Sequence, residues 1–212
     1  MTLNEIYTSF KITPSLQEHM IRVHGIVVFL QKHWKGKEVN WDLIKKSALV
    51  HDLGNIVKFN LDKYPQFLGS EQKNMEYWKK VQREMIEKYG RDDHEATRQM
   101  LTEINVDPKI VQGILGKSFH NAVEIKNSHN WLTKILLYAD LRAMPFGVVP
   151  LSERLDDVRD RMPQYTSRAD FEDLVGAALD IEKQIQHHLN VEVSEIADDS
   201  IDTDENWQSV TF

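Results

Sequence analysis

Hydrophobic residues recur at helical spacing along most of the chain. Between Ser15 and about Trp34 they fall on one face of a helix, and this stripe consists of Leu16, Met20, Val23, Val27 and Leu30. Ser15 and Glu18 have the spacing of a capping box, so Ser15 is the expected N-cap. The pattern therefore predicts a long helix here, after an irregular or short helical lead-in over residues 1–13.

The next predicted helix ends at the most distinctive stretch of the sequence. Asn40 is a suitable N-cap, and the helix runs through an apolar segment into His51 and Asp52 before Gly54 stops it. Histidine offers an imidazole nitrogen and aspartate a carboxylate oxygen, so the dipeptide is a mixed ligand pair for a divalent metal ion. By itself such a short motif is weak, because polar pairs are common at helix ends.

The remaining pattern is also helical. After a loop-like stretch over residues 55–69, Ser70 can cap a charged helix that ends at Gly90, and Ser128 can cap a later apolar one. Further helices are expected over residues 93–104, 108–115, 128–142, 151–162 and 167–189. We find no strand-type alternation, internal repeat or low-complexity tract. The predicted fold class is all-α, a compact single-domain helical bundle.

Composition narrows the class of protein. The 212 residues are 41% hydrophobic and 28% charged, which is ordinary for a soluble globular domain. The absence of cysteine excludes disulfides, thiolate zinc sites and a cysteine nucleophile, and it fits a reducing cytoplasm. The first residues lack the pattern of a secretory signal, and no apolar run approaches the ~20 residues of a membrane span. We therefore expect a cytoplasmic protein without a membrane association.

The net charge of −7 comes from the C-terminal end. After Lys183 there is no basic residue, whereas seven acidic residues follow: Glu192, Glu195, Asp198, Asp199, Asp202, Asp204 and Glu205. The rest of the chain then has 26 acidic and 26 basic residues, so it lacks the basic excess of proteins that bind long nucleic acids. We divide the chain into a helical domain over residues 1–190 and an acidic tail over 191–212. The tail also contains apolar residues, so partial docking is favoured over disorder.

Several other histidines and aspartates stand near predicted helix ends, where side chains from different helices can converge. In chain order the candidates are His19, His51, Asp52, His94, His120 and Asp140. His19 lies beside the apolar stripe of its helix and can point inward, because residues four apart share one face. Five such elements in order are more specific than any one of them.

These elements resemble the HD-domain metal-dependent phosphohydrolase superfamily over residues 15–162. The segment from His19 to Val23 is similar to the HxxRV-type opening, His51 and Asp52 to the signature pair, and Asp140 to the closing aspartate. His94 and His120 are similar to the extra histidines of members with two metals. The spacings are close to those of HD-type diadenosine-tetraphosphate hydrolases, except for a longer stretch before His94. The resemblance implies an HD-like helical core.

The resemblance also implies roles for individual residues. His19, His51, Asp52 and Asp140 would hold a first metal ion, while His94 and His120 would complete a second site bridged by Asp52. Nitrogen and oxygen donors without thiolate favour Mn, Fe, Co, Ni or Mg, one or two ions per chain. Alternatively, His94 and His120 form hydrogen bonds with a substrate phosphate or are ordinary surface residues.

Three cations near the expected site are candidate phosphate contacts: Lys58, Lys117 and Arg142, of which Arg142 follows Asp140 most closely. Members of the superfamily often have lysine directly after the His-Asp-x-Gly motif, whereas this chain has Asn55 there and Lys58 three residues later. This departure bears on the identity of the substrate more than on metal binding.

The expected function is metal-dependent hydrolysis of a phosphomonoester or phosphoanhydride bond in a nucleotide or another small phosphorylated metabolite. Catalytic roles are expected for Asp52, His94, Arg142 and Lys58. Two alternatives stay open: an HD-type diiron oxygenase, and a metal-containing binding or sensor module whose acidic tail meets a partner. A homodimer is also possible through a helical face such as Met75–Met85.

Overall fold

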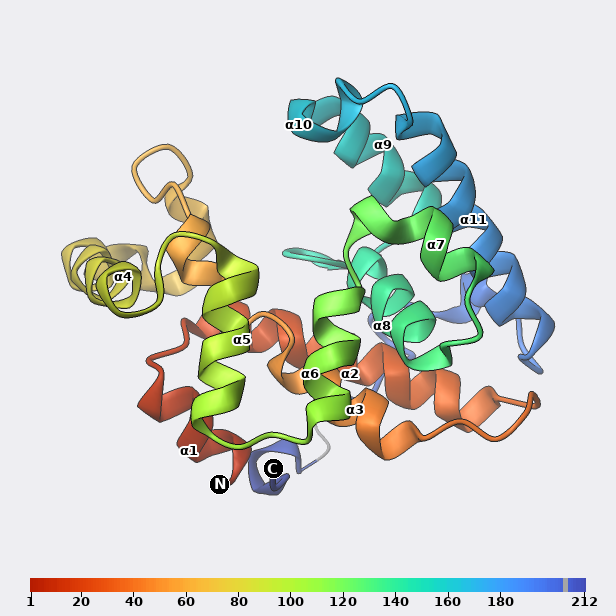
Figure 1. Cartoon of the computed structure of the whole chain (residues 1–212), viewed down its shortest axis with the longest axis horizontal. Coiled ribbons are helices and arrows are strands. Elements are labelled where there is room, and N and C mark those ends of the chain that lie inside the picture. The colour runs from red at the N-terminus through yellow and green to blue at the C-terminus, as the bar shows by residue number, and fades with distance from the viewer. Residues whose placement is uncertain (204–205) are drawn as a thin grey trace.

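The computed structural model describes residues 1–203 and 206–212, apart from the side chain of Gln164, and it has the predicted all-α fold (Figure 1). Its elements are α1 Leu3–Ser9, α2 Pro14–His33, α3 Trp41–Val50, η1 Asn55–Lys58, η2 Pro65–Asn74, α4 Met75–Tyr89, α5 Asp93–Glu103, α6 Pro108–Gly116, η3 Phe119–Asn121, α7 Ala122–Asn127, α8 Trp131–Arg142, β1 Ala143–Met144, β2 Gly147–Val148, α9 Leu151–Arg161, α10 Pro163–Thr166, α11 Phe171–His187, η4 Val193–Glu195 and η5 Trp207–Ser209. The two short strands form an antiparallel hairpin after α8. None of the described helices is long and apolar enough to cross a membrane.

Helices α2, α3 and α8 pack against one another at the centre of the molecule. The predicted stripe of α2 is buried, with Met20, Val23 and Val27 fully inaccessible to solvent. Residues 135–139 of α8 are likewise buried on every side. Burial of such side chains is worth about 1.5–3 kcal/mol each, so this three-helix core is a firm support for the polar residues at its edge.

Helix starts differ in detail from the predicted caps. Thr13 caps α2, with its Oγ1 accepting from the amide of Leu16 at 3.3 Å, because Pro14 is well suited to the first helical position. Ser15, the predicted cap, instead donates its hydroxyl to the Phe67 carbonyl at 2.5 Å and ties α2 to η2. In α8 the cap is Asn130 rather than a serine two residues earlier.

The predicted charged helix begins later than expected and its apolar face is covered. Residues up to Asn74 belong to the 3-10 segment η2, which is kinked at Gly69 with a φ of +55°, and α4 starts at Met75. Trp78, Val81 and Met85 are buried against the rest of the chain. These three side chains therefore belong to the core, and the homodimer stays a prediction.

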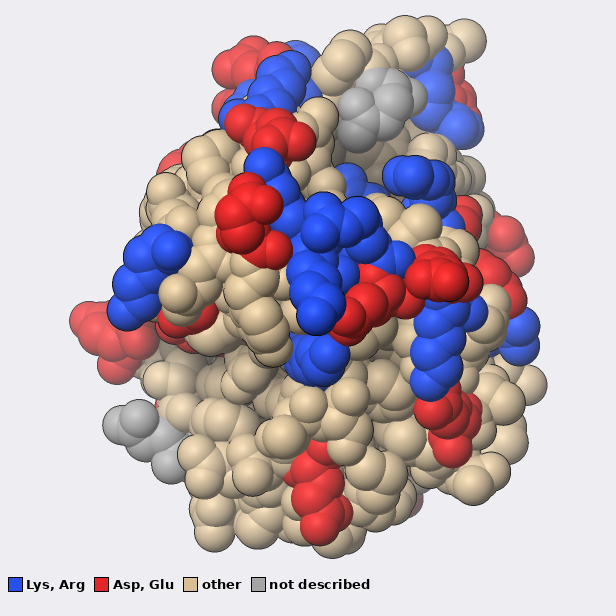
Figure 2. Space-filling model, turned by 90° about the vertical axis from the view of Figure 1, so that its left-hand side faces the viewer, with Lys and Arg blue, Asp and Glu red and all other residues tan. Residues whose placement is uncertain are grey.

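The outer face that carries α4 mixes both signs of charge. In Figure 2, which shows the left-hand side of Figure 1, Lys and Arg side chains lie among Asp and Glu. Lys79 pairs with Asp62 at 2.6 Å, and Lys11 pairs with Glu84 at 2.9 Å. Such mixed charge does not make the continuous basic surface that a long polyanion would require.

The acidic C-terminal segment docks on the body, as the sequence suggested. Ile196 and Ile201 are buried, and Trp207 lies 6.2 Å from Tyr7 between ring centroids. The amide of Leu3 donates to the Val210 carbonyl at 2.8 Å, so the two ends of the chain lie together (Figure 1). Apolar burial and backbone pairing thus outweigh the repulsion among the acidic residues.

Candidate metal centre

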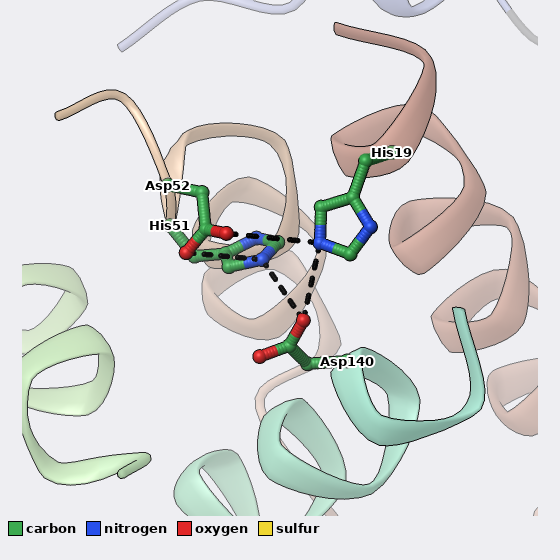
Figure 3. Close-up of side chains that lie close together, drawn as sticks. All are labelled: His19, His51, Asp52 and Asp140. Atoms are coloured by element: carbon green, nitrogen blue, oxygen red, sulfur yellow. Dashed lines mark hydrogen bonds and ion pairs between the residues drawn. The ribbon is translucent and has the colours of Figure 1, made fainter. Parts of the chain in front are cut away.

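Three helices bring four of the predicted ligands to one point (Figure 3). They are His19 from α2, His51 and Asp52 from the end of α3, and Asp140 from α8. One nitrogen or oxygen atom from each lies within 4.8 Å of the corresponding atoms of the others, which is close enough to hold a metal ion. The predicted convergence of these four residues is confirmed.

Local sequence explains how each ligand reaches this position. His19 shares the inward face of α2, and His51 is the C-cap of α3 after a fully buried apolar run. The turn that follows packs tightly on α5, because a Cβ on Gly54 would lie 2.6 Å from the backbone nitrogen of Thr97. Gly54 thus permits this close approach of two backbones; it has an ordinary right-handed φ of −83° and is not a left-handed helix stop.

The ring of His51 is held in the tautomer and orientation that metal binding requires. Its Nδ1 lies 2.8 Å from the Ala48 carbonyl oxygen, which can only accept, so Nδ1 carries the proton. In the neutral imidazole, Nε2 then presents a lone pair toward the cluster. Within the described part of the chain, this buried Nε2 has no hydrogen-bond partner. A buried polar atom without a partner is costly, and a bound cation would satisfy it.

The two carboxylates surround the same point. Asp140 Oδ1 lies 3.1 Å from Nε2 of His19 and 3.4 Å from Nε2 of His51, while Asp52 Oδ1 lies 3.5 Å from the latter. Burial by itself would raise their pKa values. Contacts with the Lys117 ammonium and with the His51 ring outweigh that effect, so the pKa values of both Asp52 and Asp140 lie well below the usual range. Both side chains are therefore anionic at neutral pH.

Two further residues hold the carboxylates, and sequence reasoning gave them no such role. Asn55, three residues after Asp52, donates its side-chain amide to Asp52 Oδ2. Lys117, expected to contact phosphate, places its ammonium 2.5 Å from Asp140 Oδ2 and 3.4 Å from Asp52 Oδ1. The position of Asn55 three residues after Asp52 was a visible signal. The contacts of Lys117 join residues far apart in the sequence, so no local sequence pattern indicated them.

The other predicted site residues are not among the four clustered ligands. His94 and His120 are exposed, and no possible metal group among the described residues includes either of them. Burial first, and then the charges of Arg168 and His94, lower the pKa of His120. Lys58 pairs with Asp93 at 2.6 Å. Burial by itself would lower the pKa of Lys58, but the negative charges of Asp52 and Asp93 outweigh burial and raise it. Roles for Lys58, His94 and His120 stay predictions.

Arg142 has a different role from the predicted one. Its guanidinium is buried and donates to the carbonyls of Val149, Val193 and Ile196, so it secures the C-terminal segment. A buried guanidinium is stable only when its donors are paired, and these backbone oxygens provide the partners. The expectation that Arg142 contacts phosphate is therefore wrong. Proximity in sequence to Asp140 was misleading because the two side chains leave α8 in different directions.

Replacing Arg142 by lysine should therefore reduce stability without weakening metal binding. A lysine cannot span three carbonyls, so we expect the free energy of unfolding to fall by about 3 kcal/mol. Urea denaturation and limited proteolysis of the C-terminal segment measure this loss. Arg159→Lys, in an exposed ion pair with Asp156, is the matched control with little change expected. Weaker metal binding at unchanged stability would contradict the assignment.

The donor set fits a divalent ion. Two imidazole nitrogens and two carboxylate oxygens are suitable for Mn, Fe, Co, Ni or Mg, and they leave coordination positions free for water or substrate.

No family model matches the chain, and comparisons with curated proteins and with solved structures gave no match. Function therefore has to be inferred from the four ligands and their surroundings.

Proposed function

We propose that this chain is a metal-dependent phosphohydrolase of the HD type, acting on a small phosphorylated substrate. The observation that carries the proposal is Nε2 of His51, a buried atom left without a hydrogen bond among the described residues and surrounded by three other ligands. The order of the four, one His, a His-Asp pair and a final Asp on three separate helices, resembles that superfamily.

The surroundings of the four ligands support a catalytic rather than a structural centre. Structural metal sites are usually closed by four strong donors, often thiolates, whereas two carboxylates and two imidazoles allow a higher coordination number. A divalent cation held here would lower the pKa of a bound water and offset the negative charge of a phosphoryl group. His19 and Asp140 retain 21% and 24% side-chain exposure, so substrate can approach from their side.

The chain's own residues provide the positioning that phosphoryl transfer requires. The Ala48 carbonyl fixes the tautomer of His51, and Asn55 orients Asp52. Lys58, whose side chain is 48% exposed, lies at the edge of the site and can exchange Asp93 for a substrate phosphate. These contacts orient the ligands and bring positive charge to the place where negative charge has to be stabilised.

Charge and geometry also favour a small substrate over the alternatives. Outside the acidic tail the chain has no excess of basic residues, and the face shown in Figure 2 mixes both signs of charge, so a nucleotide or similar metabolite is proposed in preference to a polynucleotide. A diiron oxygenase would need a second set of ligands, and among the described residues His94 and His120 form no such group. Hydrolysis, for which a single ion suffices, is therefore preferred.

A substrate panel tests the proposal. Purified protein would be incubated with Mn, Co, Ni, Mg or Fe(II) and with mononucleotides, dinucleoside polyphosphates and non-nucleotide phosphomonoesters. We expect metal-dependent phosphate or mononucleotide release that is abolished by EDTA and falls by ~10³-fold or more in Asp140→Asn. Asp62→Asn, at a carboxylate that is 83% exposed, is the control with unchanged rate.

Two outcomes would contradict the proposal. Absence of release with every ion, from protein that binds metal, would leave a binding or sensor module. Oxygen consumption by the iron-loaded protein, without phosphate release, would instead support the oxygenase alternative.

A further inference from the structure

Lys117 is a buried cation inside the candidate centre. It follows α6 as its C-cap, and its side chain is only 9% exposed. Its ammonium contacts both ligand carboxylates and lies 2.5 Å from Asp140 Oδ2 and 3.4 Å from Asp52 Oδ1. Lysine carries a positive charge at neutral pH, and these two ion pairs hold its ammonium between the carboxylates.

Each carboxylate is shared between the histidines and this ammonium. Asp140 directs Oδ1 to His19 and His51 and Oδ2 to Lys117. Asp52 places Oδ1 within 3.5 Å of both His51 and Lys117. The carboxylates thus separate two cation positions. One lies at the histidine nitrogens and is suited to a metal ion, and the other is filled by the ammonium.

The charges in the centre limit how many ions it can take. Two carboxylates and one ammonium leave a single net negative charge, which one divalent ion more than neutralises. A second divalent ion next to the same carboxylates would meet the Lys117 ammonium and would add repulsion in a mostly buried site. The exposed His94 and His120 belong to no possible metal group among the described residues, so no second set of donors offsets that cost.

We propose that Lys117 acts as a built-in second cation: the centre binds a single metal ion, and the ammonium fixes both that stoichiometry and a moderated affinity. This inference rests on the metal centre of the proposed function. Lys117 positions Asp52 and Asp140 while no ion is bound, because it holds together two carboxylates that would otherwise repel each other. Once an ion is bound, the same ammonium keeps a fixed positive charge beside it.

Metal titration of Lys117→Met tests the inference. Methionine has a similar length and no charge, so no ammonium offsets the negative charge of the two carboxylates in this variant. We expect wild-type protein to bind one equivalent of Mn²⁺ or Co²⁺ by calorimetry and native mass spectrometry. Lys117→Met should bind its first ion at least ~10-fold more tightly, because a nearby repulsive charge is gone. The metal-induced rise in melting temperature should also exceed that of the wild type.

The matched control is Lys134→Met, because Lys134 is also buried but bonds to Gln184 instead of the carboxylates. Its affinity should stay within about threefold of the wild type. Lys117→Gln is a second neutral variant in case the methionine protein does not fold, and it should show the same tightening. Circular dichroism of each variant verifies the fold.

The outcomes separate this inference from the proposed function. Two equivalents bound by the wild type would overturn it, whatever the variants do. One equivalent in the wild type, with equal or weaker affinity in both neutral variants, would overturn the role of Lys117 and leave the hydrolase proposal intact. No bound metal in the wild type would overturn both, because the centre itself would then be absent.

Discussion

Asp52→Asn should lower the affinity for a divalent ion by ~10³-fold or more, about 4 kcal/mol. The substitution removes a charged ligand that lies within reach of His19, His51 and Lys117. Changes to residues that only orient a metal ligand commonly cost 10–100-fold, and loss of the ligand itself costs more. Calorimetric titration with Mn²⁺ measures the difference.

Asp42→Asn provides the matched control for this prediction. Asp42 lies in the first turn of the same helix, α3, where it is exposed and pairs with Lys46 at 3.3 Å. Its replacement should leave metal affinity unchanged. Equal affinities of the wild type and Asp52→Asn would show that the four clustered residues do not form the site.

The unfolding free energy should fall by about 3 kcal/mol as the pH decreases from 7 to 4, because of His24. His24 is buried on α2, and burial, reinforced by Lys45 and opposed by Asp202, lowers its pKa to about 4. The folded protein therefore keeps His24 neutral while the unfolded chain takes up a proton near pH 6.5. Stability is complete above that pH and is lost progressively toward the folded-state pKa.

Urea denaturation of the metal-free protein across this range measures the slope contributed by His24. His24→Gln has no titrating ring at this position, so its stability should depend less on pH than that of the wild type. His129→Gln, at an exposed histidine, should retain the wild-type slope. Parallel pH profiles for the wild type and His24→Gln would contradict the assignment of the effect to His24.

The four clustered residues could be predicted because their order and spacing resemble the HD superfamily and because each stands near a predicted helix end or on an inward helix face. His51 follows a buried apolar run that ends α3, and Asp140 follows another within α8. An apolar helical run must enter the core, so the polar residue at its end lies where helices meet. The all-α class was equally accessible, because a period of 3.6 residues is distinct from strand alternation.

The roles of the two buried basic residues, Lys117 and Arg142, could not be predicted from the sequence. The ion pairs of Lys117 join residues 23 and 65 positions apart, and the hydrogen bonds that Arg142 donates to backbone carbonyls of the C-terminal segment reach more than 50 residues along the chain. Which basic side chain enters a core is decided by packing of distant segments, and no local pattern reports it. The predicted N-cap of α2 was wrong for a simpler reason: Pro14 occupies the first helical position, so the N-cap is the residue before it, Thr13.

The most direct test of the metal centre is anomalous X-ray scattering from crystals grown with Mn²⁺. We expect a peak bounded by Nε2 of His19, Nε2 of His51 and carboxylate oxygens of Asp52 and Asp140, at about 2.0–2.3 Å from each. A peak elsewhere on the molecule, or none at saturating Mn²⁺, would contradict the assignment of these four residues as a metal centre.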